Sequence, residues 1–182
     1  MRLDALKPLL TDSPKSAEGR SDLAVVRESL ADALTDIRDI CTGLTLPELD
    51  DLPPRSLLKK AAEVHERRTR TTVEVEIQSA PDNLEKSMKI CLYRFVQEAL
   101  SNAFRHGGGD GQRLTCEFDG ETIEVVASDT GPGFDPSIKP EGPHGLGIPG
   151  LRERIESLVG SLQVDSAPGQ GARLVLRCSV NV

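Results

Sequence analysis

The stretch QEALSNAFRH at residues 97–106 lies at the end of a long predicted helix and brings two polar residues onto its apolar side. The apolar residues keep a helical spacing, and they are Leu84, Met88, Cys91, Leu92, Phe95, Val96, Ala99 and Ala103. At about 100° per residue, Asn102 has the same angle on the helix as Leu84, and Glu98 lies at the edge of the apolar arc. Asp82 is expected to cap the helix, and glycines from residue 107 onward end it.

Glu98 and Asn102 need partners, because an unpaired buried polar group costs about 1–3 kcal/mol. Two interpretations stay open from this helix alone. The two side chains could form a local pair that satisfies nearby backbone. Alternatively, their oxygens could serve Mg²⁺, which takes few protein ligands and keeps its waters and substrate phosphates.

A second stretch, DTGPGFD at residues 129–135, follows a predicted strand. Asp129 stands at the end of that strand, where a carboxylate can accept a hydrogen bond from an exocyclic amine and so select adenine. Gly131 and Gly133 allow the backbone to approach a ligand closely. Because clusters of Asp, Gly and Pro are also ordinary turns, this stretch alone does not decide between a binding loop and a turn.

A third stretch, HGLGIPGLRERI at residues 144–155, leads from glycines directly into a predicted helix. Backbone N–H groups and the helix dipole at such a start suit a phosphate. The chain lacks the GxxxxGK[ST] pattern of a P-loop. A Pro-rich segment rather than a strand precedes the glycines, which also excludes a dinucleotide fingerprint.

The rest of the chain predicts helices interspersed with strands and hairpins. Helices are expected at residues 55–68 and 151–159, and strands at 72–77, 114–118, 122–127, 162–164 and 173–179. Tight turns are expected at Asp119-Gly120 and at residues 168–171. This order favours an α+β fold with a mixed or antiparallel sheet and helices on one face.

The N-terminal region predicts a helix that packs along another helix. Apolar residues alternate in steps of three and four through residues 21–44, at Leu23, Val26, Leu30, Ala33, Ile37, Ile40 and Leu44. The short arm at residues 3–10 cannot cover this seam, so a two-chain bundle is preferred to a helix packed on its own domain. The expected organisation is a partial helical hairpin for dimerisation at 1–46, a linker at 47–54 and a second domain at 55–182.

Composition restricts the partners. Among 182 residues, 22 Lys and Arg oppose 29 Asp and Glu, and the aromatic residues are four Phe and one Tyr. Neither a nucleic acid surface nor a stacking platform is therefore expected. No stretch approaches the ~20 apolar residues of a membrane span. The four cysteines and three histidines lack metal-ligand spacing, so no zinc site is expected and the thiols are predicted to be reduced and mostly buried.

In this order, the three stretches resemble the N, G1 and G2 boxes of the GHKL ATPase superfamily, which includes gyrase, Hsp90, histidine kinases and MutL. The resemblance is greatest to sensor histidine kinases of the nitrate-sensor and desaturase-thermosensor type. Their G2 box continues into a Gly-Leu/Met-Arg-Glu-Arg helix, matched by residues 150–154, and their linker matches LPELDDL at 46–52. The resemblance implies a Bergerat-type α/β sandwich after a dimerisation helix.

The resemblance also implies a role for each matched residue. Asn102 would hold a Mg²⁺ ion that bridges the ATP phosphates, and Glu98 would orient or deprotonate the attacking group or hold a metal-bound water. Asp129 would accept a hydrogen bond from the adenine amine, with Gly131 and Gly133 passing under the base. The residues expected around the phosphates are Arg105, His106, Gly145, Leu146, Gly147 and Gly150.

Two positions depart from the family pattern. Ala172 follows Gly169-Gln170-Gly171 where the family often has a threonine at the adenine end, so one hydroxyl contact is lost. The family's phosphate acceptor is a histidine on the first arm of the dimerising hairpin, but residues 1–10 contain none. His65-Glu66 imitates that motif after the linker, and we interpret His65 as a solvated surface residue.

The implied function is the ATP-binding catalytic region of a two-component sensor histidine kinase. It would transfer the γ-phosphoryl group to a histidine upstream or on a partner helix, and it would not phosphorylate itself without that helix. A homodimer through the N-terminal helix, a downstream response regulator and a cytoplasmic location are expected, with any membrane anchor in the rest of the parent protein. A non-catalytic dimerising nucleotide-binding module and an anti-sigma-type protein-serine kinase are the alternatives, the latter disfavoured by the heptad helix and the linker.

Overall fold

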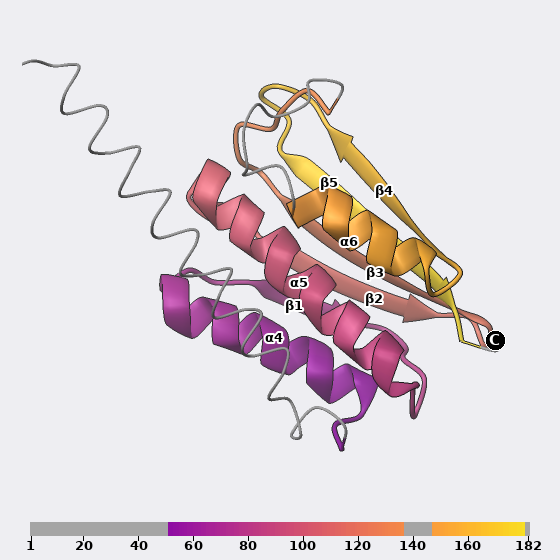
Figure 1. The fold of residues 1–182 in the computed structure, drawn as a ribbon. Coiled ribbons are helices and arrows are strands. Elements are labelled where there is room, and N and C mark those ends of the chain that lie inside the picture. Colours follow the sequence, from indigo (N-terminus) through magenta and orange to yellow (C-terminus); the bar gives the residue numbers. More distant parts are fainter. Residues whose placement is uncertain (1–50, 137–146, 181–182) are drawn as a thin grey trace, which may run out of the picture. The chain divides into compact units, whose positions relative to one another are not determined.

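A five-stranded sheet and three helices form the part of the chain that the computed structural model describes, residues 51–136 and 147–180 (Figure 1). These residues belong to a unit that spans Pro47–Val182. The predicted dimerisation helix, the linker up to residue 50, and Gly145 and Leu146 lie outside the described residues. In this described part, no helix has both the length and the apolar character that a membrane crossing requires.

The sheet is mixed, which is one of the two arrangements that the sequence predicts. Its order is β1-β2-β3-β5-β4, with bounds β1 Glu74–Ile77, β2 Arg113–Phe118, β3 Thr122–Asp129, β4 Gly160–Ser166 and β5 Ala172–Ser179. β1 pairs with β2 in parallel, and the other neighbouring strands are antiparallel. The predicted turn at Asp119 joins β2 to β3, and its carboxylate accepts the N–H groups of Glu121 and Thr122. These backbone hydrogen bonds lower the pKa of Asp119.

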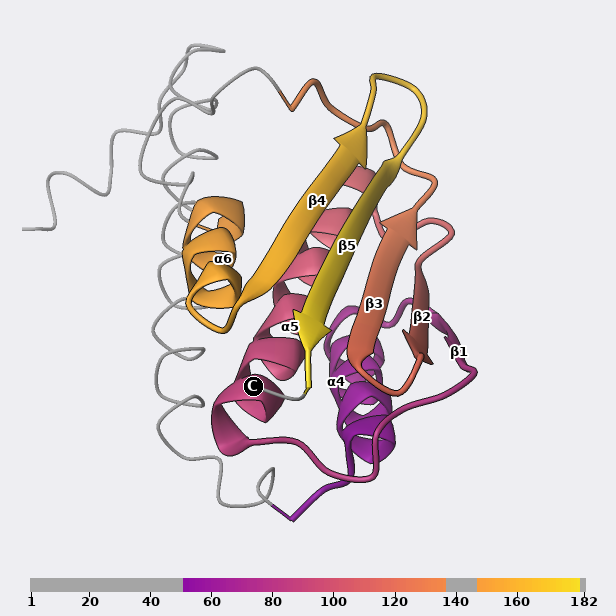
Figure 2. The ribbon, with the colours of Figure 1, turned by 90° about the vertical axis from the view of Figure 1, so that its right-hand side faces the viewer.

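The three helices cover one face of the sheet (Figure 2). Their bounds are α4 Pro54–Thr69, α5 Lys86–Gly107 and α6 Gly147–Glu156. α5 ends as predicted, because Gly108 takes the left-handed conformation that caps a helix, with φ 69°. The predicted cap at Asp82 is wrong. Leu84 is already buried ahead of the helix, and the N-cap position falls on Glu85 without a side-chain hydrogen bond.

The core lies between α5 and the central strands. Along β3, Ile123, Val125 and Ala127 are buried on the face that carries the helices, and Leu176 of β5 lies opposite Val125. Three cysteines are buried as free thiols in this region, as predicted, namely Cys91, Cys116 and Cys178. Burial raises the pKa of Cys91 to about 12 and those of the other two to about 11, so these thiols are protonated and unreactive at neutral pH.

Candidate functional site

The end of α5 contacts the loop that follows β3. A Cβ atom built on Gly107 would lie 3.1 Å from Gly131 Cα, and one built on Gly131 would lie 2.9 Å from Gly107 Cα. Only residues without a side chain permit backbones to approach this closely. The helix that carries Glu98 and Asn102 therefore meets the Asp129–Gly133 loop directly.

Asp129 lies at the last position of β3, and its side chain shares the helix-covered face with Ala127. Its Oδ1 atom accepts the N–H of Gly131 at 2.8 Å, which holds the carboxylate over the start of the loop. The strand register places Asp129 opposite Ala172 and Ala172 opposite Ser166. One aspartate, one alanine and one serine thus form a row across the ends of β3, β5 and β4.

A second contact joins α5 to the start of α6. Asn102 donates its side-chain N–H to Glu98 Oε1 at 3.0 Å, and both residues are half-buried. A Cβ atom built on Gly147 would overlap the same Glu98 oxygen, so the first residue of α6 lies against this carboxylate. The pair on α5 is therefore bounded by the part of the third stretch, residues 144–155, at which α6 begins.

The turn between β4 and β5 closes the loop from its other side. Gly169 donates its N–H to the carbonyl of Pro132 at 2.6 Å, and Phe134 donates its N–H to Ser166 Oγ at 2.9 Å. The same hydroxyl donates to the Gly171 carbonyl at 2.8 Å. Ser166 is a support of the loop that the sequence reasoning missed. Its only sequence signal is its place just before the Pro168-Gly169-Gln170-Gly171 turn.

A comparison with known proteins identifies the family of this chain. A family model described as histidine kinase-, DNA gyrase B-, and HSP90-like ATPase matches residues 88–181, more than half of the chain. The chain belongs to this ATPase family. The match includes the three stretches at residues 97–106, 129–135 and 144–155 and confirms the resemblance drawn from them.

Two curated relatives are histidine kinases by name. The signal transduction histidine-protein kinase/phosphatase DegS of Brevibacillus brevis is 30% identical over 159 residues, which are 87% of this chain and 41% of the relative. The sensor histidine kinase ComP of Bacillus subtilis is 26% identical over 88% of this chain and 21% of the relative. The ATPase-family chain thus spans less than half the length of both relatives.

The solved structure of a blue-light activated histidine kinase from Erythrobacter litoralis EL346 has the same fold. It matches with a TM-score of 0.66 at 20% sequence identity, over 84% of this chain and 50% of that one. The similarity confirms the predicted α+β architecture of the ATPase domain.

The structure brings most of the expected site residues of this ATPase domain together, but not all. Glu98, Asn102 and Gly147 form one contact, and Asp129 and Gly131 form the other through Gly107. Arg105 and His106 are exposed in the last turn of α5, at the same end. Gly150 is exposed on α6, and no atom of another element lies within 4 Å of a Cβ added to it.

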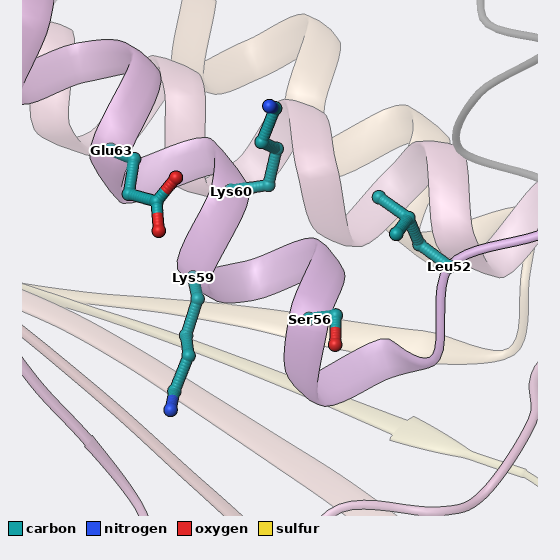
Figure 3. Close-up of a pocket in the computed structure, with 5 residues that line it drawn as sticks. All are labelled: Leu52, Ser56, Lys59, Lys60 and Glu63. Carbon is teal, nitrogen blue, oxygen red and sulfur yellow. The ribbon is translucent and has the colours of Figure 1, made fainter.

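A surface pocket on the ATPase domain lies away from these contacts. Figure 3 shows it along α4, lined by Leu52, Ser56, Lys59, Lys60 and Glu63. None of the expected site residues lines it. Within residues 51–136 and 147–180, no group of three His, Cys, Asp or Glu side chains could hold a metal ion by itself.

The expectation that His65 is a surface residue is wrong. Its side chain is 3% exposed, its Nε2 atom is 3.1 Å from Gln112 Oε1, and its ring meets the Phe104 ring edge-on. The physical reason is the helical spacing, because His65 follows Ala61 and Ala62 by four and three residues on the face of α4 that packs against α5. That stripe could have been recognised in the sequence.

Proposed function

We propose that this chain is the ATP-binding catalytic region of a two-component sensor histidine kinase. It binds ATP with Mg²⁺ and transfers the γ-phosphoryl group to a histidine on an upstream or partner dimerisation helix. The observation that supports this most is the double contact around α5, with Gly107 against Gly131 and Gly147 against Glu98. It gathers one residue set for the metal and phosphates and another for the base within one ATPase-family domain.

The residues on α5 fit a magnesium ion. Asn102 uses its amide nitrogen to bind Glu98, and that bond leaves its carbonyl oxygen, the metal-binding atom of an asparagine, oriented away from the carboxylate. One amide oxygen with a neighbouring carboxylate suits Mg²⁺, which is usually bound by one or two protein ligands and the substrate phosphates. When bound, the ion neutralises phosphate charge. Glu98 then orients the attacking group or a metal-bound water, or accepts a proton.

The end of β3 suits an adenine. Oδ1 of Asp129 already accepts the N–H of Gly131, so we assign Oδ2 to the exocyclic amine of the base. Gly131 and Gly133 let the loop pass under the ring. Arg105, His106, Gly147 and Gly150, with Gly145 and Leu146 beyond the described residues, are assigned to the phosphates. Transfer then depends on positioning and charge neutralisation, with little covalent work by the protein.

The acceptor histidine is proposed to come from elsewhere. His65 is buried against Gln112 and Phe104, so a phosphoryl group cannot reach it in the folded domain. We propose a dimerisation region at residues 1–46, a linker at 47–54 and a catalytic domain at 55–182. The acceptor lies upstream or on a partner chain, with a response regulator as the next recipient in the cytoplasm.

Calorimetry with ATP and Mg²⁺ tests the nucleotide site. The proposal predicts saturable binding, and the Asp129→Asn variant should lose preference for ATP over GTP. Asp165→Asn is the matched control, because Asp165 lies on β4 and is exposed beside Arg173. If the folded chain does not bind ATP, the proposal is contradicted. If the Asp129→Asn variant keeps the wild-type preference for ATP over GTP, the assignment of Asp129 to the adenine amine is contradicted.

A transfer assay tests the kinase reaction. The chain is incubated with γ-labelled ATP and a separate acceptor helix, and label that is acid-labile and base-stable is expected on that helix. Binding without transfer would instead support a non-catalytic nucleotide-binding module. Acid-stable label would support a protein-serine kinase.

A further inference from the structure

A buried polar network connects α4, α5 and the start of β2. Gln112, which is 2% exposed, donates its side-chain N–H to the carbonyl of Leu100 at 2.8 Å. Its Oε1 atom accepts the hydroxyl of Thr71 at 3.0 Å and lies 3.1 Å from His65 Nε2. Because the carbonyl of Leu100 requires a donor, the orientation of the Gln112 amide is determined, and His65 must donate from Nε2.

This network brackets the proposed metal ligand. Gln112 binds the backbone of α5 at Leu100, two residues before Asn102. His65 packs edge-on against Phe104, two residues after it, with ring centroids 6.3 Å apart. α4 and α5 lie side by side in both views of the ribbon (Figures 1 and 2). The helix that carries Asn102 is therefore held on both sides of this residue by side chains from outside the helix.

The same network reaches the side of the site assigned to the base. Gln112 ends the segment that leads from α5 into β2, and the carbonyl of Asp110 in that segment accepts the N–H of Thr130 at 3.0 Å. Thr130 directly follows Asp129. One glutamine thus belongs to a short connection that is bonded to the helix with Asn102 and to the loop after Asp129.

The chemistry of His65 is unfavourable for a residue that serves only stability. Its Nδ1 atom is buried without a hydrogen-bond partner, and such an atom costs free energy that an apolar side chain would not. Apolar packing alone is non-directional, whereas a hydrogen bond to a helix carbonyl restricts both rotation and sliding of that helix. The network therefore fixes the position of α5 at the expense of some stability.

We infer that His65 and Gln112 are positioning residues of the nucleotide site. They hold the segment of α5 at residues 100–104, and with it Asn102, in register with the loop that follows Asp129. This inference rests on the proposed function. Neither residue touches the nucleotide, so their effect is on the geometry of the Mg²⁺ ligand.

The test measures ATP affinity with and without Mg²⁺, together with the urea midpoint, for the full chain and four variants. His65→Leu and Gln112→Met remove the hydrogen bonds and keep an apolar side chain of similar size. His65→Gln keeps a donor near the Nε2 position and is the rescue variant. Val73→Ala is the stability control, because Val73 is buried next to the network without belonging to it.

Replacing residues that support a metal ligand typically costs about 10–100-fold in affinity. We expect His65→Leu and Gln112→Met to fold and to lose about tenfold in ATP affinity with Mg²⁺, with a smaller loss without it. His65→Gln should restore most of that affinity, and Val73→Ala should lower the urea midpoint while binding as the wild type does.

Two results would overturn the inference. Either the two apolar variants bind ATP with Mg²⁺ as well as the wild type, or Val73→Ala loses as much affinity as they do. If the wild-type chain itself does not bind ATP with Mg²⁺, the proposed function fails and the inference fails with it. Wild-type binding with unchanged variants removes the inference alone.

Discussion

Asp129 and Ala172 lie directly opposite each other at the ends of β3 and β5. Residues directly opposite each other in an antiparallel pair have neighbouring side chains on the same face of the sheet. The residue at position 172 is therefore adjacent to the carboxylate that we assign to the adenine amine, and alanine offers it no hydrogen bond.

Replacing Ala172 by threonine should strengthen ATP binding. The new hydroxyl would lie beside Asp129, and one added hydrogen bond contributes about 0.5–1.5 kcal/mol, which corresponds to roughly two- to tenfold in affinity. Calorimetry measures the change. Ala172→Val is the control, since it adds the same volume without a hydroxyl. Equal affinities for the valine and threonine variants would contradict the role of the hydroxyl.

Gly131→Ala should separate the end of α5 from the loop after β3. The added Cβ would lie 2.9 Å from both Gly107 Cα and Asp129 Oδ1, so the backbone or the carboxylate must move. Overpacking of this kind costs about 1–3 kcal/mol, and we expect it as lost nucleotide affinity together with a lower melting temperature. Thr130→Ala, at an exposed position of the same loop, should change neither quantity. Full affinity in Gly131→Ala would show that this close approach is not needed for binding.

Val159→Gly should stabilise the domain. Val159 has φ 56°, a left-handed conformation that is unfavourable for a β-branched residue, and its side chain is 68% exposed in the connection between α6 and β4. Removing the conflict should raise the free energy of unfolding by about 1 kcal/mol in a urea titration. Val159→Asn should give part of this gain and Val159→Ala little. A gain in the alanine variant equal to that of glycine would point to the exposed apolar surface as the cause.

The fold could be predicted from the sequence because its strands and helices follow simple periods. The strands predicted at residues 114–118 and 122–127 correspond to β2 and β3, and the Asp119-Gly120 dipeptide identified their turn. The start of α5 could not be placed in the same way. A capping aspartate is a local signal, but the burial of Leu84 before the helix is decided by tertiary packing.

The candidate site was only partly accessible from sequence. The three stretches at residues 97–106, 129–135 and 144–155 could be recognised, but their contacts depend on strand register, which no local pattern encodes. Gly169 meets Pro132, and Ser166 meets Phe134, only because β4 and β5 lie next to β3. His65 was misplaced for a different reason. Histidine is a polar residue type and was therefore expected to be exposed, although its position belongs to the buried helical stripe of α4.

Stability should decrease below about pH 6.5 because of His65. Burial lowers the pKa of His65 from its ordinary value of 6.5, and the nearby Arg68 lowers it further, whereas the hydrogen bond that His65 donates to Gln112 and the charge of Glu66 oppose this shift. The unfolded chain therefore takes up a proton at this residue before the folded chain does. By linkage, this contribution to stability is complete above the unfolded pKa and is lost as the pH falls toward the lower folded value.

Urea titrations between about pH 8 and about pH 5.5 measure this loss. The His65→Gln variant, which has no titrating group at this position, should lose less stability over the same interval than the wild type. Val73→Ala should follow the wild-type pH dependence at a lower free energy of unfolding, because it removes apolar contacts and retains His65. Parallel curves for the wild type and His65→Gln would show that the buried imidazole does not control acid stability.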